Sequence, residues 1–259
     1  MIDRIQERLA AACEADGRVL AAYLYGSHVA GTADEHSDVD LCLIVADGAR
    51  DAVWTEREDL IRQLGEPLLL EDFDDDRTIF FILADGTEGE LTIADAGHLA
   101  ESSRGPHRVI LDRTGVLDGV TFTGSQPGDA AQLEGLRRQV QWFWHDLSHF
   151  IAAIGRDQPW WAAGQLAELR TYCVNLARLR ADFAAPMDGF DKVDLALPAS
   201  ELAALADTFV PMDRESMLSA AHRIVEWYRS VVPDLAAAHG VPYPADLERI
   251  MVARLRALG

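Results

Sequence analysis

The chain of 259 residues is 49% hydrophobic and 25% charged, a balance typical of a globular protein with one large domain or two modest ones. Its 43 acidic residues outnumber the 23 lysines and arginines and give a formal net charge of -20. Such a chain repels polyanions, which argues against a nucleic-acid polymer as partner and favours a cationic small molecule, although solubility alone explains the charge equally well.

Neither membrane insertion nor secretion is indicated. The sequence contains no apolar run of about 18 residues, the length of a membrane-spanning helix, so no interaction with a membrane is expected. The N-terminal stretch "MIDRIQERLAAACEADG" is charged and amphipathic, unlike a signal peptide. Cys13, Cys42 and Cys173 are far apart and show neither a metal-binding spacing nor a disulfide framework. We therefore expect a protein of the reducing cytoplasm.

The first half of the chain alternates short apolar runs with turns. This pattern predicts strands at residues 18–26, 39–46, 66–71, 77–84, 89–94 and 108–112. An Asp-Gly turn within 77–94 predicts a hairpin there. Helices are expected over about 3–15 and 51–64, the second ending at a Gly-Glu-Pro sequence. This half is therefore predicted to form a mixed sheet with helices.

The second half has a helical pattern. It begins after "TFTGSQPGD" at 121–129, a Gly-, Ser- and Pro-containing stretch that indicates a linker. Helices are then expected at about 129–155, 160–184, 198–207, 213–238 and 244–258. We predict an α+β protein, in which a mixed β-sheet domain with helices at 1–125 precedes an α-helical bundle domain at 126–259.

The most informative stretch is "YGSHVAGTADEHSDVDL", residues 25–41. If a strand begins near its end, Asp38 and Asp40 point to the same face, because strand side chains alternate. Paired carboxylates repel unless a cation lies between them, and Mg²⁺ prefers carboxylate and phosphate oxygens. Gly26 allows close backbone approach to a ligand, and Ser27 adds a hydroxyl for phosphate oxygens. The stretch therefore predicts a triphosphate-binding site next to a pair of carboxylates that bind a divalent metal ion.

A third carboxylate would complete a two-metal site. Glu90 is the preferred candidate, because it lies on the second strand of the predicted hairpin and apolar residues follow it. Asp95 is the competitor, but its place before "AGHLAE" suits the N-cap of a helix.

These residues resemble the signature of the DNA polymerase beta-like nucleotidyltransferase superfamily. "GSHVAGTADEHSDVDL" has Gly-Ser, a spacer and then Asp-x-Asp flanked by apolar residues, and Glu90 resembles the third acidic position. The order of these features, followed by a helical domain, is most similar to the small antibiotic nucleotidyltransferases that adenylylate lincosamides and aminoglycosides. The motif resemblance covers residues 23–94, and the helical half is similar in kind only.

The resemblance implies a role for each site residue. Asp38, Asp40 and Glu90 would bind two Mg²⁺ ions, and Gly26 and Ser27 would contact the phosphates of ATP or another nucleoside triphosphate. Glu90 would serve as metal ligand, general base or both. A substrate hydroxyl would attack the α-phosphate in line, so that a nucleoside monophosphate is transferred and pyrophosphate leaves.

The implied acceptor is a small hydroxylated molecule, in the first place an aminoglycoside or lincosamide antibiotic, and a cationic one would suit the acidic chain. The sheet domain would be catalytic, and the helical domain would bind substrate or mediate a homodimer. Two alternatives stay open. One is adenylylation of a protein target, as in the antitoxin branch of the superfamily, and the other is a non-catalytic nucleotide-binding protein.

Three further features have open interpretations. The acidic stretch "EDFDDD" at 71–76 is either a solvated loop or a wall that attracts a cationic acceptor. His145 and His149 are four residues apart on a predicted helix, a spacing that can bind a metal, although packing or capping is the more frequent role. The helical half also contains tryptophans that either pack in its core, the more frequent role of aromatic residues at helical spacing, or stack against a base or sugar, namely Trp142, Trp144, Trp160 and Trp161.

Overall fold

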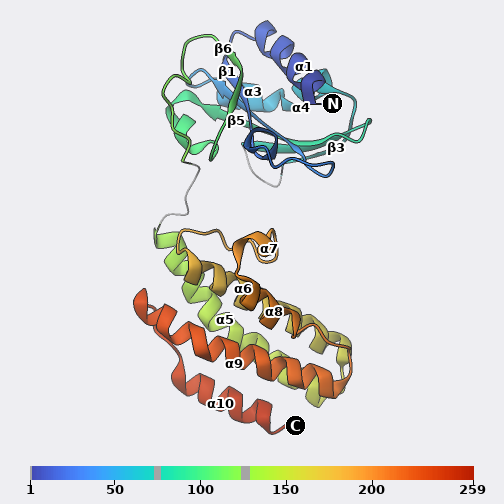
Figure 1. Ribbon diagram of the computed structural model, residues 1–259, viewed down its shortest axis with the longest axis vertical. Helices are drawn as coiled ribbons and strands as arrows, with labels where there is room; N and C mark the ends of the chain where they lie inside the picture. Colours follow the sequence, from blue (N-terminus) through green and yellow to red (C-terminus); the bar gives the residue numbers. More distant parts are fainter. Residues whose placement is uncertain (1, 73–76, 124–128) are drawn as a thin grey trace. The chain divides into compact units, whose positions relative to one another are not determined.

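The computed structural model describes residues 2–72, 77–123 and 129–259 (Figure 1). Contacts between Cα atoms divide the chain into two compact units, Met1–Gln126 and Pro127–Gly259. The predicted linker falls largely outside the described residues, as does most of the acidic stretch at 71–76.

The first unit is built on a six-stranded mixed sheet, which confirms the predicted fold. The strand order is β3-β4-β5-β2-β1-β6, with β2 and β5 parallel and every other neighbouring pair antiparallel. The predicted hairpin is formed by β4 and β5. The strands are β1 (Val19–Tyr25), β2 (Val39–Val45), β3 (Pro67–Glu71), β4 (Thr78–Leu83), β5 (Glu88–Asp95) and β6 (Arg108–Asp112).

Helices cover one face of this sheet (Figure 1). α1 (Ile2–Ala15) buries Ile5 and Leu9 there, and α4 (Arg57–Leu64) buries Ile61, among inward-facing residues of the strands such as Leu41. Burial of each such side chain contributes about 1.5–3 kcal/mol.

The prediction of one continuous helix over 51–64 is wrong, because the structure has two helices there, α3 (Arg50–Thr55) and α4. The break is at Glu56, whose backbone has φ -95° and ψ 7°. The Glu56 carboxylate pairs with Arg18, which precedes β1, at 2.5 Å. This ion pair joins residues far apart in sequence, so helical periodicity does not reveal the break.

The opposite face of the sheet is covered over only part of its length. Ala21, Tyr23 and Ile44 form a buried cluster there with Leu117 and Phe122 from the chain after β6. A short 3-10 helix, η1 (Ala96–Glu101), adds to this cover through Leu99. At the other end of β2, Asp40 is only partly buried. This uncovered end holds the acidic residues.

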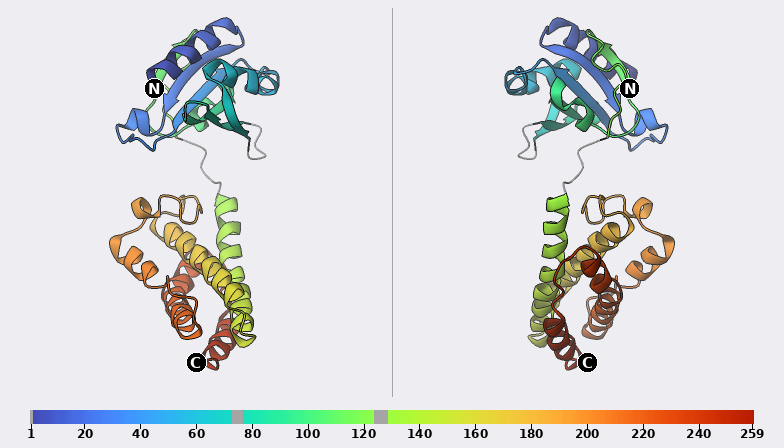
Figure 2. Two further views of the ribbon diagram at one scale, coloured as in Figure 1. Left: turned by 90° about the vertical axis from the view of Figure 1, so that its right-hand side faces the viewer. Right: turned by 90° about the vertical axis from the view of Figure 1, so that its left-hand side faces the viewer.

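Every regular element among the described residues of the second unit is a helix, as predicted (Figure 2). Its core includes Phe143 and Tyr228, whose rings stack with centroids 3.7 Å apart. None of the described helices of either unit is long and apolar enough to cross a membrane. The helices are α5 (Asp129–Gly155), α6 (Pro159–Ala181), α7 (Val193–Ala196), α8 (Ala199–Ala206), α9 (Arg214–Ala238) and α10 (Ala245–Arg256).

The tryptophans of this unit do not all lie in its core, contrary to expectation. Trp144 is 1% exposed, whereas Trp142 is 44% and Trp160 is 82% exposed. Trp142 lies within α5 on a side exposed to solvent, and Trp160 lies in the first turn of α6, where few neighbours surround it. A tryptophan near a helix end can therefore fit the helical period and still face solvent.

Candidate active site

Three central strands bring Tyr25, Asp40 and Glu90 into one row. Asp40 on β2 is paired with Tyr25 on the antiparallel β1 and with Glu90 on the parallel β5. Directly paired residues lie on the same face of a sheet, about 4.5–5.5 Å apart at Cβ. The two acidic residues, 50 positions apart in sequence, are therefore direct neighbours.

Asp38 lies one residue before β2 begins, in the loop that leads into the strand. Of the two aspartates that were predicted to share one face of a strand, only Asp40 therefore lies within β2. Both side chains are partly buried. Among the described residues, the only three metal-binding side chains with ligand atoms all within 4.8 Å of one another lie in the helical unit. Asp38, Asp40 and Glu90 would have to rotate their side chains closer to share one ion.

Asp95, the competitor of Glu90, lies at the far end of β5. Its register partner is Val45, five positions beyond the Asp40–Glu90 pair. Asp95 does precede η1 as its N-cap residue, but its side chain makes no capping hydrogen bond. Its Oδ2 atom instead lies 3.8 Å from Nε of Arg50. The sheet therefore brings Glu90, and not Asp95, beside Asp40.

Gly26 forms a tight turn between β1 and the four-residue helix α2 (Ser27–Ala30). Its φ of 70° and ψ of -153° are readily adopted only by glycine. A Cβ atom at this position would come closer to Oδ2 of Asp40 than the 3.0 Å that real Cβ atoms respect. The backbone of the turn is therefore packed directly against one of the acidic side chains.

Ser27, which follows, has a buried hydroxyl without a partner. Its Oγ atom makes no hydrogen bond in the structure. The turn around it is well bonded, since the carbonyl of Ser27 accepts from the N–H groups of Gly31 and Thr32, both at 3.1 Å. An unsatisfied buried hydroxyl costs about 1–3 kcal/mol. An oxygen-rich ligand such as a phosphate would satisfy this hydroxyl.

Tyr25 was not singled out from the sequence, although it immediately precedes the Gly-Ser pair. Its hydroxyl lies 3.5 Å from Oγ1 of Thr92, which in turn lies 3.1 Å from Oγ1 of Thr78. Burial raises the pKa of Tyr25 most, the Thr92 hydrogen bond opposes this, and the charges of Asp40 and Glu90 raise the pKa further. The phenol therefore stays protonated beside the acids. Only the pairing of β1 with β2, absent from the motif itself, could have indicated this residue.

The donor chemistry of this cluster fits Mg²⁺. Asp38, Asp40 and Glu90 offer carboxylate oxygens only, which suit a hard cation better than a transition metal. The hydroxyl of Ser27, which has no partner and follows the glycine packed against Asp40, is a donor suited to a phosphate oxygen.

A comparison with protein families finds a match within the first unit. Residues 7–82 match the family model described as Polymerase beta, Nucleotidyltransferase. The first unit therefore contains, at residues 7–82, a polymerase beta-like nucleotidyltransferase domain. The matched stretch contains Gly26, Ser27, Asp38 and Asp40 and ends before Glu90.

Among solved structures, the chain is similar to an aminoglycoside 6-adenyltransferase from Bacillus subtilis. Sequence identity is 13%, the match covers 98% of this chain and 97% of that chain, and the TM-score is 0.45. No curated protein sequence matches this chain.

Proposed function

We propose that this protein is a Mg²⁺-dependent nucleotidyltransferase that transfers a nucleoside monophosphate, AMP in the first place, to a hydroxyl group of a small molecule. The observation that carries this proposal is the register of β1, β2 and β5. It aligns Asp40 with Glu90 next to the Gly26 turn of a nucleotidyltransferase domain.

In this proposal Asp38, Asp40 and Glu90 hold the metal through their carboxylate oxygens. The chemistry that Mg²⁺ would supply there is neutralisation of charge on the phosphates and orientation of the attacking and leaving oxygens. Gly26 lets the backbone approach the phosphates, and the hydroxyl of Ser27 donates to a phosphate oxygen, which satisfies an otherwise orphaned group.

The chemical step is an in-line displacement at the α-phosphorus of the nucleoside triphosphate. The acceptor oxygen forms a bond to the α-phosphorus as the bond to the bridging oxygen of the β-phosphate breaks, and pyrophosphate leaves. Glu90 takes the proton of the acceptor hydroxyl. Tyr25, kept protonated by burial and by the neighbouring carboxylates, presents a neutral donor beside them.

The acceptor class rests on the motif and on charge. A formal net charge of -20 favours a cationic acceptor, so aminoglycosides come first and lincosamides second. Acceptor binding or homodimer formation by the helical unit remains a prediction, and so does a cytoplasmic location.

The proposal is tested by measuring pyrophosphate release with Mg²⁺ and each nucleoside triphosphate against a panel of these antibiotics, with mass spectrometry of the acceptor. We expect an acceptor-dependent signal, a nucleoside monophosphate added to the acceptor, and loss of both in Asp40→Asn. Asp34→Asn is the matched control, because Asp34 lies in the loop that leads into β2 and its carboxylate accepts from the nearby His36 N–H and Ser37 hydroxyl.

Two outcomes would contradict the proposal. Equal pyrophosphate release by Asp40→Asn and the unmodified protein would refute the metal site. Absence of pyrophosphate release with every antibiotic of the panel would refute the antibiotic acceptor. It would favour either a protein target or nucleotide binding without catalysis. A measurement of nucleotide binding by Asp40→Asn and the unmodified protein, together with a search for a modified protein, then separates these two.

A further inference from the structure

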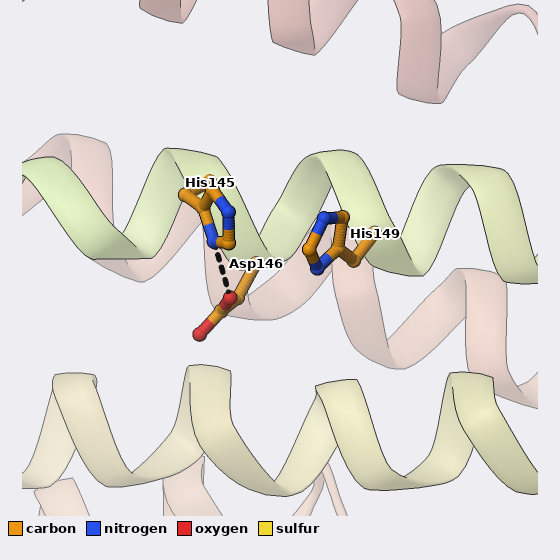
Figure 3. A group of neighbouring side chains, drawn as sticks. All are labelled: His145, Asp146 and His149. Atoms are coloured by element: carbon orange, nitrogen blue, oxygen red, sulfur yellow. Dashed lines mark hydrogen bonds and ion pairs between the residues drawn. The ribbon is translucent and has the colours of Figure 1, made fainter.

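His145, Asp146 and His149 form a compact group on α5 that the proposed reaction does not use (Figure 3). Each residue offers one ligand atom, and these atoms all lie within 4.8 Å of one another. Within the described parts of the chain, no other three His, Cys, Asp or Glu side chains are gathered this closely.

The helix itself aligns the two histidines. Residues four apart on an α-helix lie on the same face, one turn from each other. The rings of His145 and His149 accordingly have centroids 4.3 Å apart and are inclined by 64°. Figure 3 shows both rings on the same side of α5, with the Asp146 carboxylate next to the His145 ring.

Asp146 orients the first of these rings. Its Oδ1 atom lies 2.7 Å from Nδ1 of His145. A carboxylate accepts hydrogen bonds and does not donate them, so Nδ1 is the donor, and in the neutral ring the lone pair for a metal is on Nε2. Histidines that bind metals commonly donate their other ring N–H to a carboxylate in this way.

A second helix holds that carboxylate in place. The hydroxyl of Tyr172 on α6 donates to Oδ2 of Asp146 at 2.7 Å. The Asp146 side chain is 11% exposed, whereas that of His145 is 47% exposed. The orienting group is therefore fixed between two helices, while the ligand it orients is accessible to an ion from solvent.

We propose that His145 and His149 bind a borderline divalent transition-metal ion, with Zn²⁺ as the best chemical match, and that Asp146 orients His145 for this. Imidazole nitrogens suit Zn²⁺, Cu²⁺ and Ni²⁺, whereas Mg²⁺ prefers oxygen ligands. The site is thus chemically distinct from the carboxylate cluster on the sheet. Two protein ligands leave the remaining coordination positions to water or to a donor atom of a further molecule.

The test is calorimetric titration of the full-length, tag-free protein with ZnCl₂ in the presence of excess Mg²⁺ and without nucleotide. We expect one Zn²⁺ to bind per chain, and the single variants His145→Ala and His149→Ala to weaken it by at least about tenfold. His222→Ala is the matched control and should change nothing. His222 is a partly exposed helical histidine of the same unit that belongs to no group of this kind among the described residues.

A second measurement separates loss of the ligands from loss of the fold. Co²⁺ bound through histidine nitrogens gives visible absorption bands, which both alanine variants should lose while their far-ultraviolet circular dichroism stays unchanged. Asp146→Asn should keep the bands and weaken binding by about 10–100-fold, as expected for an orienting group. Equal Zn²⁺ affinity in the unmodified protein and in the double variant His145→Ala/His149→Ala would overturn the proposal, and so would the absence of any bound Zn²⁺.

Discussion

Gly26 and Asp40 are packed so closely that any side chain at position 26 would overlap the carboxylate of Asp40. The glycine is required for its backbone conformation as well, because its φ of 70° lies where other residues are strained. The turn and the acid are therefore one structural unit, and a change in either moves the other.

Gly26→Ala should consequently abolish nucleotidyl transfer by displacing the Asp40 carboxylate. Gly31→Ala is the matched control, because Gly31 has φ 77° but a methyl group added there would meet nothing within 4 Å. We expect both variants to lose about 1–2 kcal/mol of stability from backbone strain alone, with a further loss for Gly26→Ala. Steady-state turnover and urea denaturation measure the two effects. Similar turnover in both variants would contradict the tight packing of Gly26 on Asp40.

Ser27→Ala should weaken binding of the nucleoside triphosphate without lowering the stability of the protein. Removing a buried hydroxyl that has no partner should leave the free energy of unfolding unchanged or slightly increased. The KM for the nucleoside triphosphate should rise by about 5–10-fold, since one hydrogen bond to a phosphate oxygen, worth about 1–1.5 kcal/mol, is lost. Thermal unfolding and initial rates at varied nucleotide concentration provide the measurements. A destabilised variant with unchanged KM would show that the hydroxyl is structural.

Glu90→Gln should lower kcat by about 10²–10⁴-fold, the usual contribution of a general base. Glu88→Gln is the natural control, because Glu88 lies two residues earlier on β5, on the same face but paired with Ile82 of the hairpin. Its turnover should match that of the unmodified protein. Asp95→Asn completes the set, and a greater loss in that variant than in Glu90→Gln would reverse the assignment of the third acid.

Asp112, at the end of β6, should make stability depend on pH. Its carboxylate accepts from the backbone N–H groups of Thr114, Gly115, Val116 and Leu117 at 2.8–3.1 Å. Desolvation opposes ionisation, but these donors outweigh it and lower the pKa of Asp112.

Because the pKa is lower in the folded state, the stabilisation is fully present above the unfolded value of about 3.9 and is lost as the pH falls through the folded value. Asp112→Asn should therefore cost about 1–2 kcal/mol at neutral pH and less under acid. Urea denaturation at neutral and acidic pH checks this. A constant difference between variant and unmodified protein across both conditions would argue against the carboxylate as the cause.

Sequence reasoning predicted the sheet because its strands are short apolar runs bounded by turn residues. It could not predict the break at Glu56, which coincides with an ion pair to Arg18 that only the folded chain brings about. The helix α2 was also missed, since four residues are too few for a helical period to be visible.

The candidate acids were visible in the sequence, but their arrangement was not. Asp38 and Asp40 belong to one motif, whereas the position of Glu90 relative to them depends on parallel pairing between strands far apart in the chain. The same sheet reveals Tyr25 as a neighbour of the acids, through the pairing of β1 with β2. Periodicity describes one strand at a time, and the register between strands follows from packing of the whole sheet.

The central place of β2 and β5 has a consequence for local unfolding. In the described sheet the outermost strands, β3 and β6, each have one neighbour, whereas β2 lies between β1 and β5. Fluctuations that open a sheet begin where fewest bonds hold a strand, so amide hydrogens at the edges should exchange with solvent first. The backbone amide hydrogens around Asp40 and Glu90 should be among the last to exchange. The two acidic residues should therefore keep their spacing while the edge strands open locally.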